Sequence, residues 1–166
     1  MRSNLLPLVL CIASLVALSS CATSRSTIPP AKTDFPSYGF EALHGSSVKL
    51  TVLDQRPERN DSDLLMSRVR ASLSAALTAN GVGVEPSSEQ ELEVRITQLR
   101  SDFELGNWQG CTRMTARLRQ QGEDRRFEAD RCVTKSNMFG YKSASEALTL
   151  SFHDALAQLL SELDAL

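Results

Sequence analysis

The sequence is poor in the residues on which metal sites and most hydrolases depend. Its 166 residues include only two histidines, His44 and His153, and neither has a cysteine at ligand spacing. Zinc sites need a local cluster of three or four Cys, His or carboxylate ligands, so we expect no metal. The sequence also lacks G-x-S-x-G, P-loop, H-E-x-x-H and C-x-x-C motifs. We therefore expect no catalytic residues, and a protein that is not an enzyme.

Long apolar runs are absent after the first twenty residues. The single run, from Leu5 to Leu18, follows the basic Arg2 and precedes two small residues, which is the three-part pattern of a secretory signal. It is shorter than the stretch of about 20 apolar residues that a transmembrane helix needs. We therefore expect residues 1–20 to be removed as a signal peptide.

The end of this signal, Leu18-Ser19-Ser20-Cys21, resembles the lipobox of bacterial lipoproteins. We expect cleavage between Ser20 and Cys21 and a covalent lipid on the Cys21 thiol, with no other cofactor. Two or more acyl chains anchor a protein stably to a membrane. The alternative is an ordinary signal peptide that ends near Ala22. Because alanine and not aspartate follows the cysteine, the resemblance favours the outer membrane, with the domain facing the periplasm.

The remaining chain has no excess of positive charge. Loss of residues 1–20 removes Arg2 and no acidic residue, which leaves 17 basic and 20 acidic residues and a net charge of −3. This balance gives no electrostatic basis for nucleic-acid binding. The length suits one domain. Besides Cys21, only Cys111 and Cys132 remain, and an even pair in an oxidising compartment predicts a disulfide.

Residues 21–47 have no apolar period and are rich in Ser, Thr, Pro and Gly. This composition predicts a lipidated cysteine followed by a flexible tether, with a single domain over residues 48–166. Phe35, Tyr38 and Phe40 are the exceptions, because these aromatic side chains could dock on the domain. The end of the tether is therefore left open.

Apolar periodicity predicts the first elements of the domain. Val48, Leu50 and Val52 alternate with polar residues, as in a half-buried strand. A helix over 62–80 follows, which we expect to be capped by Asp61 or Ser62 and ended by Gly81. Strands are then predicted over 82–85 and about 92–103. The predicted helix carries one apolar stripe, formed by Leu65, Val69, Leu73, Ala76 and Leu77.

Residues 110–133 predict an antiparallel hairpin that turns at Gln121-Gly122. In this register Met114 faces Ala129 on an apolar side, while Cys111 faces Cys132 on the other side. Directly opposed residues lie within disulfide reach. A slip by two residues keeps the faces but misaligns the cysteines, so we prefer the first register. It also places Arg113 opposite Asp130, Thr115 opposite Glu128, Ala116 opposite Phe127 and, less favourably, Arg117 opposite Arg126.

The last segment, 143–166, predicts a second amphipathic helix. Ser143 and Glu146 have the spacing of a capping box. The expected order is strand, helix, three strands, helix, which predicts an α+β two-layer sandwich. The stripe of this helix comprises Leu148, Phe152, Leu156, Leu159 and Leu163.

Two surfaces are candidates for binding. Arginines suit phosphate contacts, so the outer sheet face could bind a lipid, lipopolysaccharide or glycan phosphate. The alternative is a solvated face with cross-strand ion pairs. Phe103, Leu105 and Trp108 form the second candidate, which either closes the core edge or contacts a protein partner. The arginines of the sheet face are Arg95, Arg113, Arg117 and Arg126.

The order and spacing of these elements resemble the YajG-type lipoproteins of Gram-negative bacteria. The matching features are the lipobox, Asp54-Gln55-Arg56 after the first strand, Asn80-Gly81 after the helix, and the run 92–99 with its continuation to Asn107. The cysteine pair is a departure from that family. The resemblance implies a lipoprotein without catalytic residues. We expect a membrane-anchored accessory domain with an envelope protein partner; the alternative is the phosphate-binding module.

Overall fold

The computed structural model describes residues 28–137 and 140–166. The predicted cleavage site after Ser20 and the predicted lipid attachment at Cys21 therefore lie outside the described residues. Within these two ranges, no helix is long and apolar enough to cross a membrane.

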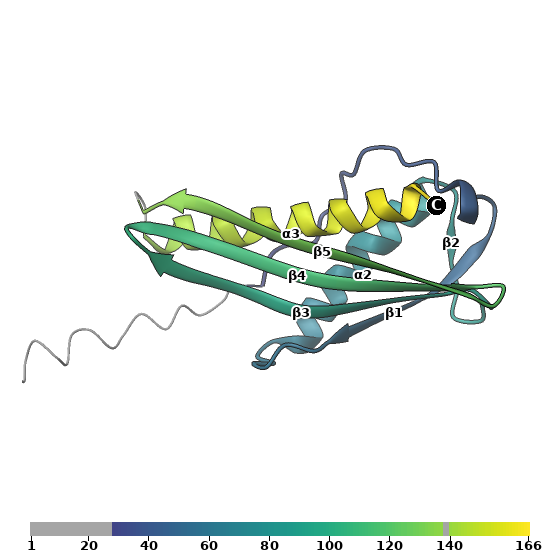
Figure 1. The fold of residues 1–166 in the computed structure, drawn as a ribbon, viewed down its shortest axis with the longest axis horizontal. Helices are drawn as coiled ribbons and strands as arrows, with labels where there is room; N and C mark the ends of the chain where they lie inside the picture. Colours follow the sequence, from purple (N-terminus) through teal and green to yellow (C-terminus); the bar gives the residue numbers. More distant parts are fainter. Residues whose placement is uncertain (1–27, 138–139) are drawn as a thin grey trace, which may run out of the picture.

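The described residues form a five-stranded sheet and two α-helices (Figure 1). The sheet order is β2-β1-β3-β4-β5; β1 is parallel to both of its neighbours, and β3, β4 and β5 are antiparallel. The predicted α+β class is confirmed, and the short β2 brings the number of strands between the two helices to four, one more than the expected three. The elements are η1 (Glu41–Leu43), β1 (Ser47–Asp54), α2 (Ser62–Ala79), β2 (Gly83–Val84), β3 (Glu91–Glu104), β4 (Asn107–Gln120), β5 (Glu123–Ser136) and α3 (Tyr141–Asp164).

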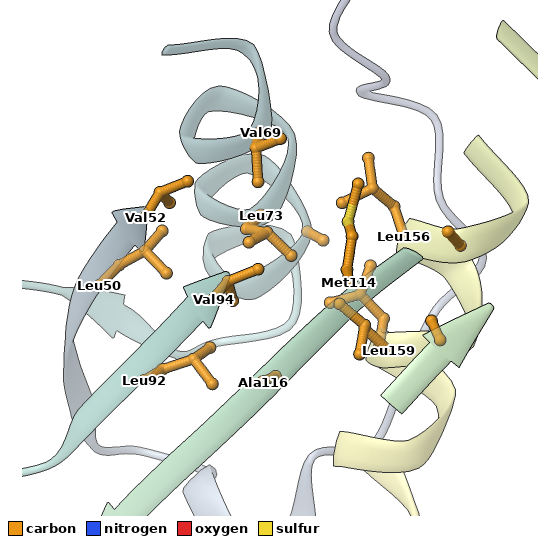
Figure 2. Packing of buried hydrophobic residues seen from close by; sticks show 14 of the residues in the cluster. Leu50, Val52, Val69, Leu73, Leu92, Val94, Met114, Ala116, Leu156 and Leu159 are labelled. Atoms are coloured by element: carbon orange, nitrogen blue, oxygen red, sulfur yellow. The ribbon is translucent and has the colours of Figure 1, made fainter. Parts of the chain in front are cut away.

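The core lies between one face of the sheet and the two helices. Alternate residues of β1 and β3 point into it, and the apolar stripes of α2 and α3 meet them there (Figure 2). Both predicted stripes are buried along their whole length. Burial of such side chains contributes about 1.5–3 kcal/mol each, so this interface is the main source of stability. Figure 2 labels ten of the residues involved, among them Val52, Leu73, Val94, Met114 and Leu156.

The β4–β5 hairpin has the predicted register throughout. Met114 pairs with Ala129, Arg113 with Asp130 and Arg117 with Arg126. Cys111 pairs with Cys132, and the two form a disulfide with a Cα–Cα distance of 4.2 Å. Cys111 is buried and Cys132 is exposed, so the bond joins a central strand to the edge strand.

The helix caps differ from the prediction. Asp61 precedes α2 in a left-handed conformation (φ 57°), and its side chain caps no amide. Helix α3 begins at Tyr141, after Gly140, so Ser143 lies inside the first turn and is buried against the domain instead of capping it. Gly81 has a φ of 81° after α2, as predicted, because this residue type reaches the left-handed region without strain.

The predicted tether is too long, because the chain already packs on the domain from Ile28 onward. We call residues 28–46 the N-terminal strap. Phe40 and Leu43 are fully buried, and Ile28 is 5% exposed. The strap crosses both helices: the Lys32 amide donates to Ser72 Oγ of α2 (2.9 Å), and the Phe40 amide donates to Asp164 Oδ1 of α3 (2.7 Å). Its apolar residues have no regular spacing, which is why its composition resembled a linker.

A close approach of α3 to β4 depends on Gly110. A Cβ atom at this position would overlap the backbone of Ala147 and Leu148. We expect Gly110→Ala to displace α3 and to lower the free energy of unfolding by at least about 2 kcal/mol, as overpacked cores do. Chemical denaturation measures this loss. Gln109→Ala, one residue away on the opposite face, is the control; equal stability of the two variants would contradict this account.

Candidate interaction site at the free edge of β3

One edge of β3 has no partner strand over its second half. Strand β1 pairs with β3 only from Glu91 to Ile96, whereas β3 continues to Glu104. Over 97–104, no strand of the described residues pairs with β3 on the side away from β4. The register also shifts between Ile96 and Gln98, where a β-bulge alters the strand. An unpaired strand edge presents backbone donors and acceptors to another chain.

A groove of about 790 Å³ borders this free edge. It is bounded by the loop that follows β1 and by the aromatic pair at the end of β3. Its lining combines backbone, apolar and charged groups, which suits a peptide segment better than a small apolar ligand. The lining residues are Arg56, Pro57, Glu58, Thr97, Gln98, Leu99, Arg100, Ser101, Asp102, Phe103 and Trp108.

A buried ion pair shapes the loop wall of this groove. Arg56 Nε donates to Asp54 Oδ1 (2.9 Å), and its Nη2 donates to Asp54 Oδ2 (2.8 Å). The side chains of Arg56 and Asp54 are 5% and 1% exposed. Arg56 Nη2 also donates to the backbone oxygen of Asn60 (3.1 Å), so the pair closes the loop onto the end of β1. Bidentate arginine–carboxylate pairs are among the strongest hydrogen-bonded contacts in proteins.

The pair changes the acidity of Asp54. Burial alone would raise the pKa of this carboxyl group, but the hydrogen bonds from Arg56, a hydrogen bond from Ser62 and the guanidinium charge outweigh burial. The pKa of Asp54 is therefore lowered from its ordinary value. Because the charged form is the stabilised one, the pair supports the fold at neutral pH.

Phe103 and Trp108 lie opposite one another on β3 and β4 and form the far end of the groove. Their ring centroids are 5.1 Å apart and the rings are tilted by 51°. Trp108 Nε1 donates to Asn137 Oδ1 (2.9 Å), which ties the pair to the end of β5. Phe103 is 50% exposed, so it does not close the core edge. Of the two roles considered from the sequence, an accessible contact fits Phe103.

The turn next to this pair exposes a leucine in a strained conformation. Leu105 and Gly106 connect β3 to β4 with φ values of 49° and 80°. Two positive values define a type I′ hairpin turn, which favours Asn, Asp or Gly at its first central position. Leu105 is 92% exposed and therefore gains little from packing in this position. No feature of the fold explains an apolar residue there.

The arginine face carries an ion pair at each predicted position. Arg95 Nε donates to Glu93 (2.7 Å), Arg113 Nε to Asp130 (2.9 Å) and Arg117 Nε to Asp124 (2.6 Å). Arg126 lies 3.9 Å from the same Asp124. A shallow hollow of about 410 Å³ lies over three of these arginines.

Hydrogen bonding on this face also shifts the pKa values of the paired groups. The hydrogen bond from Arg117 lowers the pKa of Asp124, and the hydrogen bond to Asp130 raises the pKa of Arg113. These shifts stabilise the charged forms and so keep the pairs ionised. A phosphate would have to compete with these carboxylates, which favours the alternative of a solvated face with cross-strand pairs.

The sequence-predicted residues thus form two separate groups, and two important features were missed. The arginines lie on the outer face, whereas Phe103 and Trp108 lie at the end of the β3–β4 hairpin. The Asp54–Arg56 pair was noted only as the end of a strand, although an Asp-x-Arg spacing before proline was visible. Leu105 was part of the second candidate surface, but its place in a two-residue turn with positive φ was not predicted, although a Leu-Gly turn between two long strands is itself unusual.

Comparisons with known proteins support the fold. No protein-family model matches the sequence. No curated protein matches it either. Solved structures do match: XCC0632 from Xanthomonas campestris, a DUF330 protein, is 16% identical with a TM-score of 0.53, and the match covers 82% of this chain and 91% of that one. The chain shares the fold of this bacterial protein.

Two further solved structures match with lower scores. The lipoprotein GNA1162 from Neisseria meningitidis is 14% identical with a TM-score of 0.46, and the match covers 70% of this chain and 99% of that one. CT253 from Chlamydia trachomatis is 10% identical with a TM-score of 0.49, at 74% and 96% coverage. At these identities the likeness concerns the fold alone, and membership of the YajG-type family stays a prediction.

Within residues 28–137 and 140–166, no group of three or more His, Cys, Asp or Glu side chains is placed to hold a metal ion. Neither histidine lines the groove. His153 Nε2 lies 3.2 Å from the backbone oxygen of Pro30 in the strap, and His44 follows η1.

The buried pair can be tested by removing one partner or both. We expect Asp54→Leu to lower the free energy of unfolding by about 3–5 kcal/mol, because it leaves Arg56 charged and unpaired in a buried site. The double variant Asp54→Leu/Arg56→Met should recover most of this loss, since it leaves no buried charge. Urea denaturation measures both. A double variant no more stable than the single one would contradict the account.

The same variants test the pH dependence of stability. The folded pKa of Asp54 lies below its unfolded value of about 3.9, so the unfolded chain takes up the proton first as the pH falls. The contribution of the pair should be complete above about pH 5 and should fade on acidification below about pH 4. We expect wild type to lose more stability than the double variant between pH 5 and pH 3. If the free energy of unfolding fell equally with pH in wild type and in the double variant, Asp54 would not contribute to the pH dependence of stability.

Leu105 should be replaceable with a gain in stability. Asparagine tolerates the left-handed region better than leucine, so we expect Leu105→Asn to raise the free energy of unfolding by about 0.5–1 kcal/mol. Thermal unfolding followed by circular dichroism measures the change. Gln121→Asn, at the same position of the β4–β5 turn, is the matched control and should give a similar gain. A destabilised Leu105→Asn variant would show that the leucine supports the fold.

Proposed function

We propose that this protein is a non-enzymatic lipoprotein of the bacterial cell envelope, anchored at the outer membrane through Cys21. Its domain faces the periplasm and binds another envelope protein along the free edge of β3. The observation that carries this proposal is the unpaired edge over 97–104 beside the groove. The lipobox at Leu18-Ser19-Ser20-Cys21 supports the anchor.

A strand edge beside a groove suits the binding of an extended peptide. In this mode, the backbone of the partner pairs with the open strand, and pockets receive alternate side chains. The bulge at Thr97 and the end of β1 at Asp54 define where the open edge starts. Phe103 and Trp108 close the other end and offer aromatic surface, which is enriched at the centres of protein interfaces. The segment between them is long enough for a short strand of a partner.

The arginine face supports a second function less well. Its guanidinium groups already bind carboxylates of the same sheet, so a phosphate ligand gains only by displacing them. Exposed ion pairs are weak, however, and charge reversal is an informative control. The variant Arg95→Glu/Arg117→Glu alters this face and leaves the β3 edge intact.

Site-specific photo-crosslinking tests the partner surface. A photoreactive residue at Gln98 or Phe103 should yield the same discrete protein adduct in the envelope of the bacterium that produces the chain. The same group at Thr115, on the outer sheet face, should not yield it. The adduct should persist in Arg95→Glu/Arg117→Glu, because this variant does not touch the groove.

Two results would overturn the proposal. The first is membrane-anchored protein that forms no adduct from Gln98 or Phe103. The second is an adduct that forms equally well from Thr115. Loss of binding to anionic lipid or lipopolysaccharide in the charge-reversal variant, with no effect on the groove, would instead support the alternative of a phosphate-binding module.

A further inference from the structure

We propose that the tip of the β3–β4 hairpin is a membrane-contact element, in which Leu105 and the exposed side of Phe103 insert into the lipid–water interface. This inference goes beyond the proposed function and uses only its anchor at Cys21. It starts from a difference between the two long hairpins. One hairpin end of the sheet is apolar and exposed, and the other is polar.

The two turns have the same backbone and opposite chemistry. Gln121 and Gly122 join β4 to β5 with φ values of 50° and 87°, close to those of Leu105 and Gly106. The first position is a polar glutamine in one turn and a leucine that is 92% exposed in the other. The difference therefore does not arise from turn geometry. A strained position occupied by an exposed apolar side chain indicates a role outside the fold.

The neighbours of Leu105 extend the apolar tip. Phe103, two residues before Leu105, is 50% exposed. Tyr141, which is 53% exposed, begins α3 at the same end of the molecule. The amide of Asn137 donates to the backbone oxygen of Gly106 (3.2 Å), so the end of β5 also lies at this tip. Aromatic and leucine side chains gathered at one end are typical of surfaces that meet a bilayer interface.

The strap places this tip toward the anchor. Arg68, in the first half of α2, donates to the backbone oxygens of Ile28 and Pro29. Helix α2 begins where β1 ends, and β3 continues beyond this point to the tip. Figure 1 accordingly shows the purple start of the strap nearer the β3–β4 turn than the β4–β5 turn.

The chain between Cys21 and Ile28 is short. Cys21 lies seven residues before Ile28, and a chain of this length spans at most about 25 Å even when fully extended. A lipid on Cys21 therefore holds this half of the domain close to the bilayer. The tip can therefore reach the surface more readily than the β4–β5 turn, which lies farther from the start of the strap.

The charged side chains nearest the tip balance one another, because Glu104, beside the turn, and Lys135, opposite Trp108, carry opposite charges. Arg100 pairs with Asp102, and Lys142 lies 3.9 Å from Glu146. The contact should therefore depend on apolar insertion, and it should occur on phosphatidylcholine as well as on anionic lipid. This property separates it from binding by the arginine face.

The single tryptophan of the chain lies at the tip and reports on the contact. The mature chain from Cys21, with the disulfide intact, has one free thiol, which can be coupled to a maleimide lipid in phosphatidylcholine vesicles. We expect brominated acyl chains to quench Trp108 and its emission to shift to the blue. Leu105→Gln should lower the equilibrium constant for contact, obtained from the quenched fraction of Trp108, at least about tenfold, the effect of losing one leucine side chain from an apolar environment.

Two controls share the same anchor. Gln121→Leu, which adds an exposed leucine to the distal turn, should leave the quenching of Trp108 unchanged. Trp108→Phe/Glu123→Trp moves the reporter to the distal end and should abolish quenching. Equal quenching of both reporters, no quenching of Trp108, or full quenching in Leu105→Gln would overturn the inference.

The assay separates this inference from the proposed function. Chemical coupling supplies the anchor whether or not the cell attaches lipid at Cys21, and no partner protein is present. A negative result with vesicles would therefore not contradict partner binding at the β3 edge. Conversely, the absence of groove adducts in the envelope leaves the result with vesicles unaffected.

Discussion

The early end of β1 is the constraint on which the rest of the site depends. The Asp54–Arg56 pair and the following Pro57 turn the chain away from the sheet, while β3 runs on to Glu104. Proline cannot donate to a strand ladder, and the buried pair holds the loop in place. The unequal lengths of these two parallel strands leave one edge of β3 open and set the groove beside it. The β3–β4 hairpin projects for the same reason, because β3 continues beyond the end of β1.

Periodic features of the fold were predictable from the sequence. The stripes of α2 and α3, the alternation in β1 and the β4–β5 register all follow from spacing alone, because a face that must be buried imposes its period on the residues. The register had an additional constraint: only one alignment brought Cys111 opposite Cys132 while keeping Met114 and Ala129 on the apolar side. The cysteine pair and the apolar face of the hairpin therefore specify the same register, and such agreement makes the register predictable.

Features without a regular spacing of apolar residues could not be predicted from the sequence. The strap packs through scattered residues such as Ile28, Phe40 and Leu43, which join a core formed by residues far away in the sequence. Ser143 and Glu146 have the spacing of a capping box, but a cap must stand at the start of the helix. Helix α3 starts two residues earlier, at Tyr141 after Gly140. The free edge of β3 exists because β3 is longer than its parallel neighbour β1. Neither strand shows it alone, so the groove required the structure.

The strap also determines how the domain is held mechanically. Its backbone is hydrogen-bonded to Arg68 and Ser72 on α2, to Asn80 directly after α2, and to Asp164 on α3. A pull on the chain ahead of Ile28 therefore acts on the helical layer at several points, and not on the end of a strand. The open edge of β3 is thereby separated from the point where the load is applied. The load would therefore pass first into the two helices that cover the core.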